Sequence, residues 1–295
     1  MPNIIKSFLK RSIAFLYIQF GCVERAKKKI IKNQSIVSIY FHNPTFKTFN
    51  DCISWLINNG FDFLDIRELL KSKDHPLVYK KPMVIITIDD GWRDNLLNIV
   101  PIAHFNQIPV TIFSTTEPLI EGGGYWWSYI KAGIKKGITT CTVPFLKSLP
   151  NVNRLSILNH VKPLIHLDRE SMTVEELKAI AISPYVQIGA HTISHPILPN
   201  CSDEIADNEI GQSKSILEAI LAKPVYSFSY PNGDYTEREL ILVEKHGYQL
   251  AFTTQPALIE PGINMDLLKL PRFEVMDDAS LDENICRMTG VWFKK

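Results

Sequence analysis

Seven short runs of apolar residues, most of them rich in β-branched or aromatic side chains, recur along the 295-residue chain. Runs of this length and composition are typical of buried β-strands. The runs that we predict as strands are 36–41, 83–88, 110–115, 186–190, 226–230, 250–254 and 268–272. Helical stretches separate several of them, and strands that alternate with helices pair in parallel through crossover connections. The pattern therefore predicts an α/β fold.

Three stretches between these runs repeat apolar residues at helical spacing, namely 46–59, 203–221 and 237–246. Ser202 or Asp203 can cap the second of these helices, because a short polar side chain accepts the free backbone N–H groups of the first turn. Gly247 follows the third and is typical of a helix end.

The longest interval between predicted strands, residues 116–184, is predicted to be an insertion on the loop face of the fold. A helix is expected at 151–169, interrupted near Pro163. Trp126 and Trp127 lie near the start of the insertion. Their rings suit the apolar faces of a sugar, and packing of the insertion onto the rest of the fold is the alternative role.

Two short motifs, each at the end of a predicted strand, carry residues suited to metal chemistry: Asp89 with Asp90, and His191 with His195. Two histidines and one carboxylate are a common ligand set for a catalytic divalent metal with one position left open. Asp90 is the predicted carboxylate ligand. Because side chains alternate along a strand, Asp89 is expected to point elsewhere and to act as a general base. Pro196 favours a loop over a helix at the second motif.

Together the motifs resemble those of the polysaccharide deacetylase family, also called the NodB homology domain or carbohydrate esterase family 4. Residues 87–91 (Thr-Ile-Asp-Asp-Gly) resemble the first motif, 191–196 (His-Thr-Ile-Ser-His-Pro) the second, and 228–233 (Phe-Ser-Tyr-Pro-Asn-Gly) the third. The similarity extends over about residues 37–275. The resemblance implies a distorted (β/α)7 barrel of parallel strands, with its active site at the carboxyl ends of the strands.

The resemblance also implies roles for the motif residues. Asp89 is the general base, while Asp90, His191 and His195 hold one divalent metal. Zinc is the expected ion, with cobalt, nickel, iron and manganese as alternatives.

In the third motif, the backbone N–H of Asn232 is expected to help bind the oxyanion. Tyr230 and Pro231 are expected to contact the substrate.

Three positions depart from the family pattern. Asn232 replaces the common tyrosine of the third motif, which would alter the contacts with the substrate. The third motif lacks the arginine that orients the catalytic aspartate in many members, and Arg272 is the predicted replacement, with a surface arginine as the alternative. No late Leu-x-His segment follows Leu250. His42, which ends the first predicted strand, is therefore the predicted general acid, and a hydrogen-bonded turn residue is the alternative.

Charge and cysteine content narrow the function classes. The net charge is +1, with 45% hydrophobic and 21% charged residues, so a globular protein without a nucleic-acid-binding surface is expected. The five cysteines are odd in number and scattered, which indicates free thiols in a reducing compartment, none of them a metal ligand.

Residues 1–34 are predicted to form a basic amphipathic segment that precedes the barrel domain, 35–295. The apolar run 12–23 is too short to span a bilayer and is flanked by lysines and arginines, without a cleavage site of small residues. This pattern favours peripheral contact with an anionic membrane surface on the cytoplasmic side. A helix packed on the barrel, and an exported domain with an uncleaved anchor, are the alternatives.

These inferences predict a metal-dependent hydrolase that removes the N-acetyl or another N-acyl group from an amino sugar in a polysaccharide or glycan precursor. The membrane-associated N-terminus favours a lipid-linked or nucleotide-linked precursor. The alternatives are a carbohydrate-binding pseudoenzyme, and a deformylase or deacylase of a lipid-linked sugar or small amide.

Overall fold

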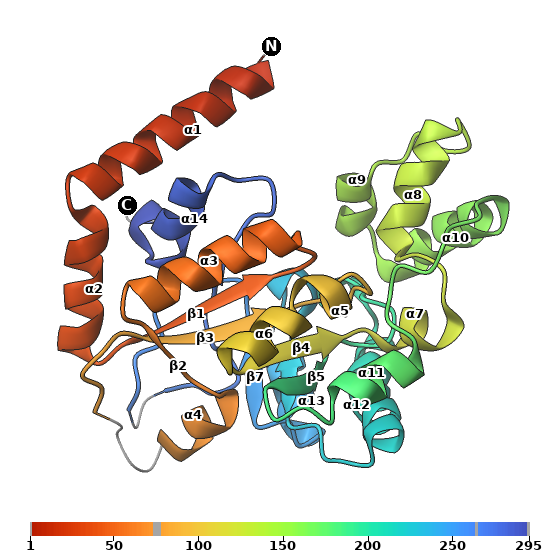
Figure 1. The fold of residues 1–295 in the computed structure, drawn as a ribbon. Coiled ribbons are helices and arrows are strands. Elements are labelled where there is room, and N and C mark those ends of the chain that lie inside the picture. The colour runs from red at the N-terminus through yellow and green to blue at the C-terminus, as the bar shows by residue number, and fades with distance from the viewer. Residues whose placement is uncertain (1, 73–77, 263–264, 294–295) are drawn as a thin grey trace.

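A computed structural model describes residues 2–72, 78–262 and 265–293, and Figure 1 shows a central curled sheet with helices packed around it. The strands are β1 (Ile36–Phe41), β2 (Asp62–Phe63), β3 (Met83–Ile88), β4 (Val110–Ser114), β5 (Val186–Ala190), β6 (Ser227–Ser229), β7 (Leu250–Phe252) and β8 (Phe273–Glu274). Their order is β7-β6-β5-β4-β3-β1-β8, with β2 beside β3. All these pairs are parallel, which confirms the α/β prediction.

The segment after β7 reaches both edges of the sheet. Leu270 forms a parallel bridge with Phe252 of β7, and Phe273 of β8 then pairs with Ile39 of β1. Because one short segment contacts both edge strands, the sheet curls into an incomplete barrel. The predicted distorted (β/α)7 barrel is thus confirmed as a curled parallel sheet.

Six predicted strands lie where expected, some of them one or two residues shorter at an end. The predicted strand 268–272 is wrong, because regular pairing with β1 starts only at Phe273. Arg272 instead directs its side chain into the barrel interior, where it is fully buried. The two-residue strand β2 was not predicted, since two residues show no period.

The three predicted helices outside the insertion are confirmed. They are α3 (Phe46–Asn58), α12 (Asp203–Leu221) and α13 (Glu237–Lys245). The hydroxyl of Ser202 caps α12 by accepting the backbone N–H of Ile205. Further helices of the barrel are α4 (Ile66–Ser72), α5 (Asn95–Asn98), α6 (Val100–Asn106), α11 (Val174–Ile180) and α14 (Leu281–Met288), with 3₁₀ turns η2 (Leu198–Asn200), η3 (Pro231–Gly233) and η4 (Val291–Phe293).

The insertion forms a helical subassembly beside the barrel (Figure 1). It contains α7 (Thr116–Glu121), α8 (Trp126–Lys135), α9 (Val143–Ser148), α10 (Asn151–Val161) and the 3₁₀ turn η1 (Lys162–Leu164). A small apolar core holds these helices together through residues such as Ile130, Leu146 and Val161. The predicted helix 151–169 is too long, because it ends at Val161 and the 3₁₀ turn with Pro163 leads into extended chain.

Two helices precede β1. Helix α2 (Cys22–Asn33) buries Val23, Ala26 and Ile30 in the same core as the barrel strands. Helix α1 (Pro2–Gln19) packs on α14 near Ala14 and extends away from the barrel (Figure 1). Among the described helices, none is long and apolar enough to cross a membrane.

Candidate metal and catalytic site

The predicted motif residues converge at the carboxyl ends of the strands. Asp89 and Asp90 directly follow β3, and His191 directly follows β5. The chain turns sharply here, because Asp90 and Gly91 both have left-handed backbone conformations, with φ of 75° and 83°. A Cβ atom at Gly91 would lie 2.9 Å from the hydroxyl of Ser114, so glycine is required for the turn.

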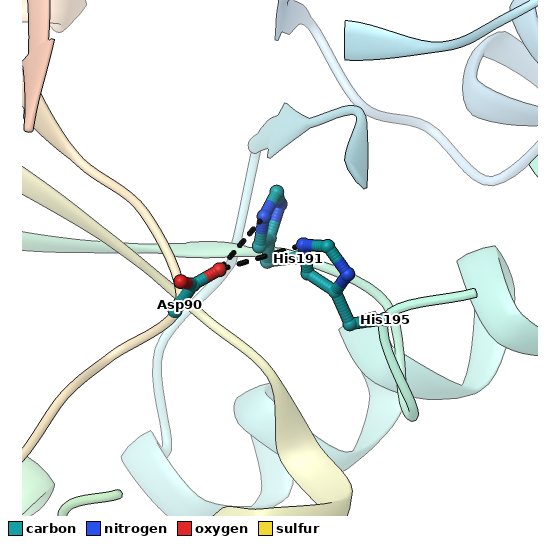
Figure 2. A group of neighbouring side chains, drawn as sticks. All are labelled: Asp90, His191 and His195. Atoms are coloured by element: carbon teal, nitrogen blue, oxygen red, sulfur yellow. Dashed lines mark ion pairs between the residues drawn. The ribbon is translucent and has the colours of Figure 1, made fainter. Parts of the chain in front are cut away.

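Asp90, His191 and His195 form a buried group of three metal-binding side chains that point toward one another (Figure 2). Their ligand atoms all lie within 4.8 Å of one another. Asp90 Oδ1 lies 3.5 Å from His191 Nε2 and 3.4 Å from His195 Nε2. It is buried and has no hydrogen-bond partner among the described residues. Such an unpartnered oxygen between two imidazole nitrogens fits a divalent cation.

Neighbouring groups fix the orientation and the charge of these side chains. His191 Nδ1 donates to the carbonyl of Ser229 at 2.7 Å, which leaves Nε2 free to bind a metal. Burial lowers the pKa of His195 to about 3, so that this imidazole is neutral, as a ligand must be. Burial alone would raise the pKa of Asp90, but the close approach of His191 and the charge of His195 hold it below its ordinary value. Asp90 and His195 thus have the protonation states of metal ligands. For His191, burial alone would lower the pKa, but the close contact with Asp90 and the charges of Asp89 and Asp90 raise it.

The loop that carries His195 is anchored by the helix that follows it in sequence and by a helix of the insertion. Glu209 of α12 accepts the backbone N–H groups of Ile193 and Ser194 at 2.8 and 2.9 Å, and the Ser194 hydroxyl at 2.6 Å. Trp126 of α8 donates its indole N–H to the carbonyl of His195 at 3.0 Å. The loop, which the sequence predicted here, is confirmed, and it is held on both sides.

Asp89 is paired with Arg272 inside the barrel. Two guanidinium nitrogens donate to the two carboxylate oxygens at 2.8 Å each. Burial would raise the pKa of Asp89, but the charge of Arg272, followed by that of His191, keeps it below its ordinary value. Arg272 is also held by the hydroxyl of Ser229 at 2.8 Å and lies over the ring of Tyr40. It therefore occupies the interior and is not a surface arginine.

A cavity of about 270 Å³ opens over these residues. His42, which directly follows β1, lines it together with Asp89 and Asp90. The remaining lining residues are Trp92, Trp127, Lys131, Val143, Lys147, His191, His195, Asn232 and Thr254. The His42 ring packs edge-on against Tyr40, with 5.4 Å between ring centroids.

Of the four residues expected to contact the substrate, only Trp127 lines the described cavity over the metal-binding residues. Trp127 lines the cavity and packs edge-on against His195. Trp126 borders a neighbouring cavity in the insertion. Tyr230 and Pro231 are buried beneath the site, with the Tyr230 hydroxyl donating to a backbone carbonyl, and neither belongs to the described lining.

Several site residues were missed by the sequence reasoning. Trp92 donates its indole N–H to Asp90 Oδ2 at 2.9 Å. Its position two residues after Asp90 could have drawn attention to it. Glu209, Lys131 and Lys147 lie on helices outside the motifs, and no local pattern marks them.

Comparisons with known proteins agree with this geometry. The family model described as "Polysaccharide deacetylase" matches residues 78–251. A Bacillus subtilis (strain 168) protein, YxkH, which is described as a polysaccharide deacetylase, is 27% identical over 236 residues. This match covers 78% of the present chain and 66% of YxkH, just under two thirds of that relative.

Solved structures share the fold. The deacetylase PplD of Streptococcus pyogenes, solved with acetate, has a TM-score of 0.63 at 17% identity, covering 86% of this chain and 98% of PplD. IcaB of Ammonifex degensii has a TM-score of 0.62 at 16% identity, covering 87% of this chain and 97% of IcaB. Because the family model covers more than half of the sequence, the chain belongs to the polysaccharide deacetylase family, a family of hydrolases that act on carbon–nitrogen bonds.

Proposed function

We propose that the protein is a metal-dependent deacetylase that hydrolyses the N-acetyl, or another N-acyl, group of an amino sugar in a polysaccharide or glycan precursor. One observation carries the proposal: Asp90 Oδ1 is buried without a hydrogen-bond partner among the described residues, between His191 Nε2 and His195 Nε2. An acceptor left unsatisfied in this way is costly unless a cation completes it.

Asp90, His191 and His195 would hold the cation, for which zinc is the expected ion. When bound, a divalent cation polarises the amide carbonyl and lowers the pKa of water. Asp89 has no direct role in holding it. Arg272 keeps Asp89 ionised and oriented, so that its carboxylate accepts the proton of the attacking water.

Two further groups complete the proposed reaction. The backbone N–H of Asn232, at the cavity wall, donates to the oxyanion that develops on the acyl oxygen. His42, from another side of the same cavity, protonates the leaving amine. The rings of Trp92 and Trp127 offer apolar faces to the sugar.

The finer proposal is a membrane-associated protein that acts on a lipid-linked amino sugar. Helix α1 exposes Phe8, Leu9, Phe15 and Leu16, and the turn after it exposes Phe20. Helix α2 exposes the basic residues Arg25, Lys28, Lys29 and Lys32. Exposed apolar side chains beside basic ones fit an anionic membrane surface. All five cysteines are free, which supports a reducing compartment such as the cytoplasm.

The first test measures metal content by mass spectrometry together with acetate release from an N-acetylglucosamine oligomer. The wild type should carry one divalent metal and release acetate, and His191→Ala should lose both. His166→Ala, an exposed histidine far from the motifs in sequence, is the matched control and should retain both.

The outcomes separate the candidate functions. Bound metal without acetate release, followed by turnover of a formyl or simple amide substrate, would replace the deacetylase by a deformylase or deacylase. Sugar binding without turnover of any amide would favour a pseudoenzyme. A wild type that takes up no metal after reconstitution would refute the metal-dependent mechanism.

A further inference from the structure

Two lysines from the insertion line the cavity that contains Asp89 and Asp90. Lys131 comes from α8 and Lys147 from α9. The Lys147 ammonium donates to Asn232 Oδ1, and the Lys147 carbonyl accepts the side-chain amide of Asn200 at 2.9 Å. The end of α9 is thus attached to two loops of the barrel, which places the Lys147 charge at the rim of the site.

The charges around this rim are unbalanced. Within the described part of the chain, neither Lys131 nor Lys147 has a carboxylate within 4.0 Å. Asp89 is already paired with Arg272, and Asp90 faces the two histidine ligands. Among opposing charges, that of Asp234 has the largest effect on the pKa of Lys147.

Lys131 and Lys147 line the same cavity, and their like charges oppose each other. Burial lowers the pKa of Lys147, and Lys131 lowers it further, while Asp234 and Asp90 oppose the change. Like charges held together on one wall are unfavourable unless an anion joins them. A divalent cation on Asp90 would make the cavity more positive still.

We propose that Lys131 and Lys147 bind an anionic group, a phosphate or a carboxylate, which the substrate carries next to its N-acyl amino sugar. The inference rests on the proposed function and names its substrate class. The apolar side chains of Trp127 and Val143 line the same cavity and leave room for the sugar ring. Lysine is a common ligand of phosphate and binds it as a point charge.

The test compares three N-acetylated sugars: methyl N-acetylglucosaminide, which is neutral, N-acetylglucosamine 1-phosphate and N-acetylmuramic acid. The kcat/KM of the wild type should be about tenfold higher for at least one charged sugar than for the neutral one, because each partly exposed ion pair contributes a severalfold gain. A preference for N-acetylglucosamine 1-phosphate would identify phosphate as the group bound, and a preference for N-acetylmuramic acid would identify carboxylate. The preference should decline as salt is raised.

The variants are Lys131→Met and Lys147→Gln, alone and combined. Glutamine removes the charge at position 147 but keeps a hydrogen-bond donor for Asn232. A lower preference for charged sugars in this variant therefore reports the lost charge and not a lost contact between Asn232 and α9. The charged-to-neutral ratio of kcat/KM should fall toward one in the double variant. The single variant Lys147→Arg, which keeps the positive charge, should retain the ratio of the wild type. Lys135→Met, an exposed lysine at the end of α8 outside the described cavity lining, is the control.

An unchanged ratio in the double variant, or equal use of charged and neutral sugars by the wild type, would overturn the inference. If no sugar is turned over, the proposed function fails separately. Calorimetric binding of the same three sugars to the zinc-loaded wild type and double variant then decides the inference. A preference for the charged sugars that requires both lysines would uphold it, and its absence would refute it.

Discussion

The ion pair between Asp89 and Arg272 should control both stability and reactivity. Both side chains are buried, so Arg272→Met would leave an unpaired carboxylate in the barrel, which costs about 3–5 kcal/mol. The pKa of Asp89 should rise without the guanidinium, and less of the base would be ionised at neutral pH. We expect lower stability in urea unfolding at pH 7 and a loss of acetate release by about a hundredfold or more.

A second substitution tests whether the cost comes from the unpaired charge. Asp89→Asn combined with Arg272→Met should recover part of the stability but none of the activity. The contribution of the pair should be complete above the unfolded-state pKa of an aspartate, about 3.9, and should be lost as the pH falls through the lowered pKa of Asp89. Arg272→Met with wild-type stability at pH 7 would contradict this account.

His42 should matter for the leaving group and not for the metal. It lines the cavity but does not belong to the group formed by Asp90 and the two histidine ligands. His42→Gln should lower kcat for amide hydrolysis about a hundredfold and leave metal content unchanged. Hydrolysis of p-nitrophenyl acetate, whose leaving group needs no proton, should be nearly unaffected, whereas Asp89→Asn should lose both reactions. Equal losses on amide and ester in His42→Gln would argue against a general acid.

At the scale of elements, helix α12 should determine how well the second motif binds metal. Glu209 accepts three hydrogen bonds from the loop between His191 and His195. Glu209→Ala should therefore weaken zinc binding 10- to 100-fold, as loss of a group that orients metal ligands does. Competition with a chelator measures this affinity, and Glu209→Gln should show a smaller loss. Glu204→Ala, exposed on the same helix, is the control, and equal affinity in Glu209→Ala would refute the role.

The elements also show what the sequence could predict. Asp89, Asp90 and His191 were predictable because they follow strands directly, and parallel strands bring their carboxyl ends together. His195 was predictable from its spacing of four residues after His191. Arg272 was named as the partner of Asp89 although its strand was misplaced. The pairing of Arg272 with Asp89 requires only that the arginine side chain be buried next to the carboxylate. The bounds of β8 depend instead on where the chain begins to pair with β1.

The contacts that α8, α9 and α12 make with the site were not predictable. Their positions follow from how these helices pack on the sheet and on one another, and a helical period fixes only which face is buried. Glu209 and Lys147 appear in the sequence as ordinary helix residues with no metal or ligand motif around them.

For the whole molecule, the first two helices have different roles. Helix α2 contributes Val23, Ala26 and Ile30 to the barrel core, so removal of residues 1–34 should destabilise the fold. Helix α1 and the turn after it expose large apolar side chains, including Phe15 and Phe20, the latter 70% exposed. Point substitutions on α1 in the full chain therefore test membrane contact without disturbing the core.

We expect the wild type to bind vesicles that contain phosphatidylglycerol, more weakly at high salt and hardly at all to neutral phosphatidylcholine vesicles. Phe15→Glu with Phe20→Glu should weaken binding at least tenfold, because each phenylalanine buried in the membrane interface contributes about 1.5–3 kcal/mol. Phe105→Glu changes an exposed phenylalanine on α6, 88% exposed, and should leave binding unchanged. If the Phe15→Glu/Phe20→Glu variant and the Phe105→Glu variant sediment equally with the vesicles, the region of α1 does not make the membrane contact. Acetate release from a water-soluble oligomer should be the same in all three proteins, since neither helix reaches the described cavity lining.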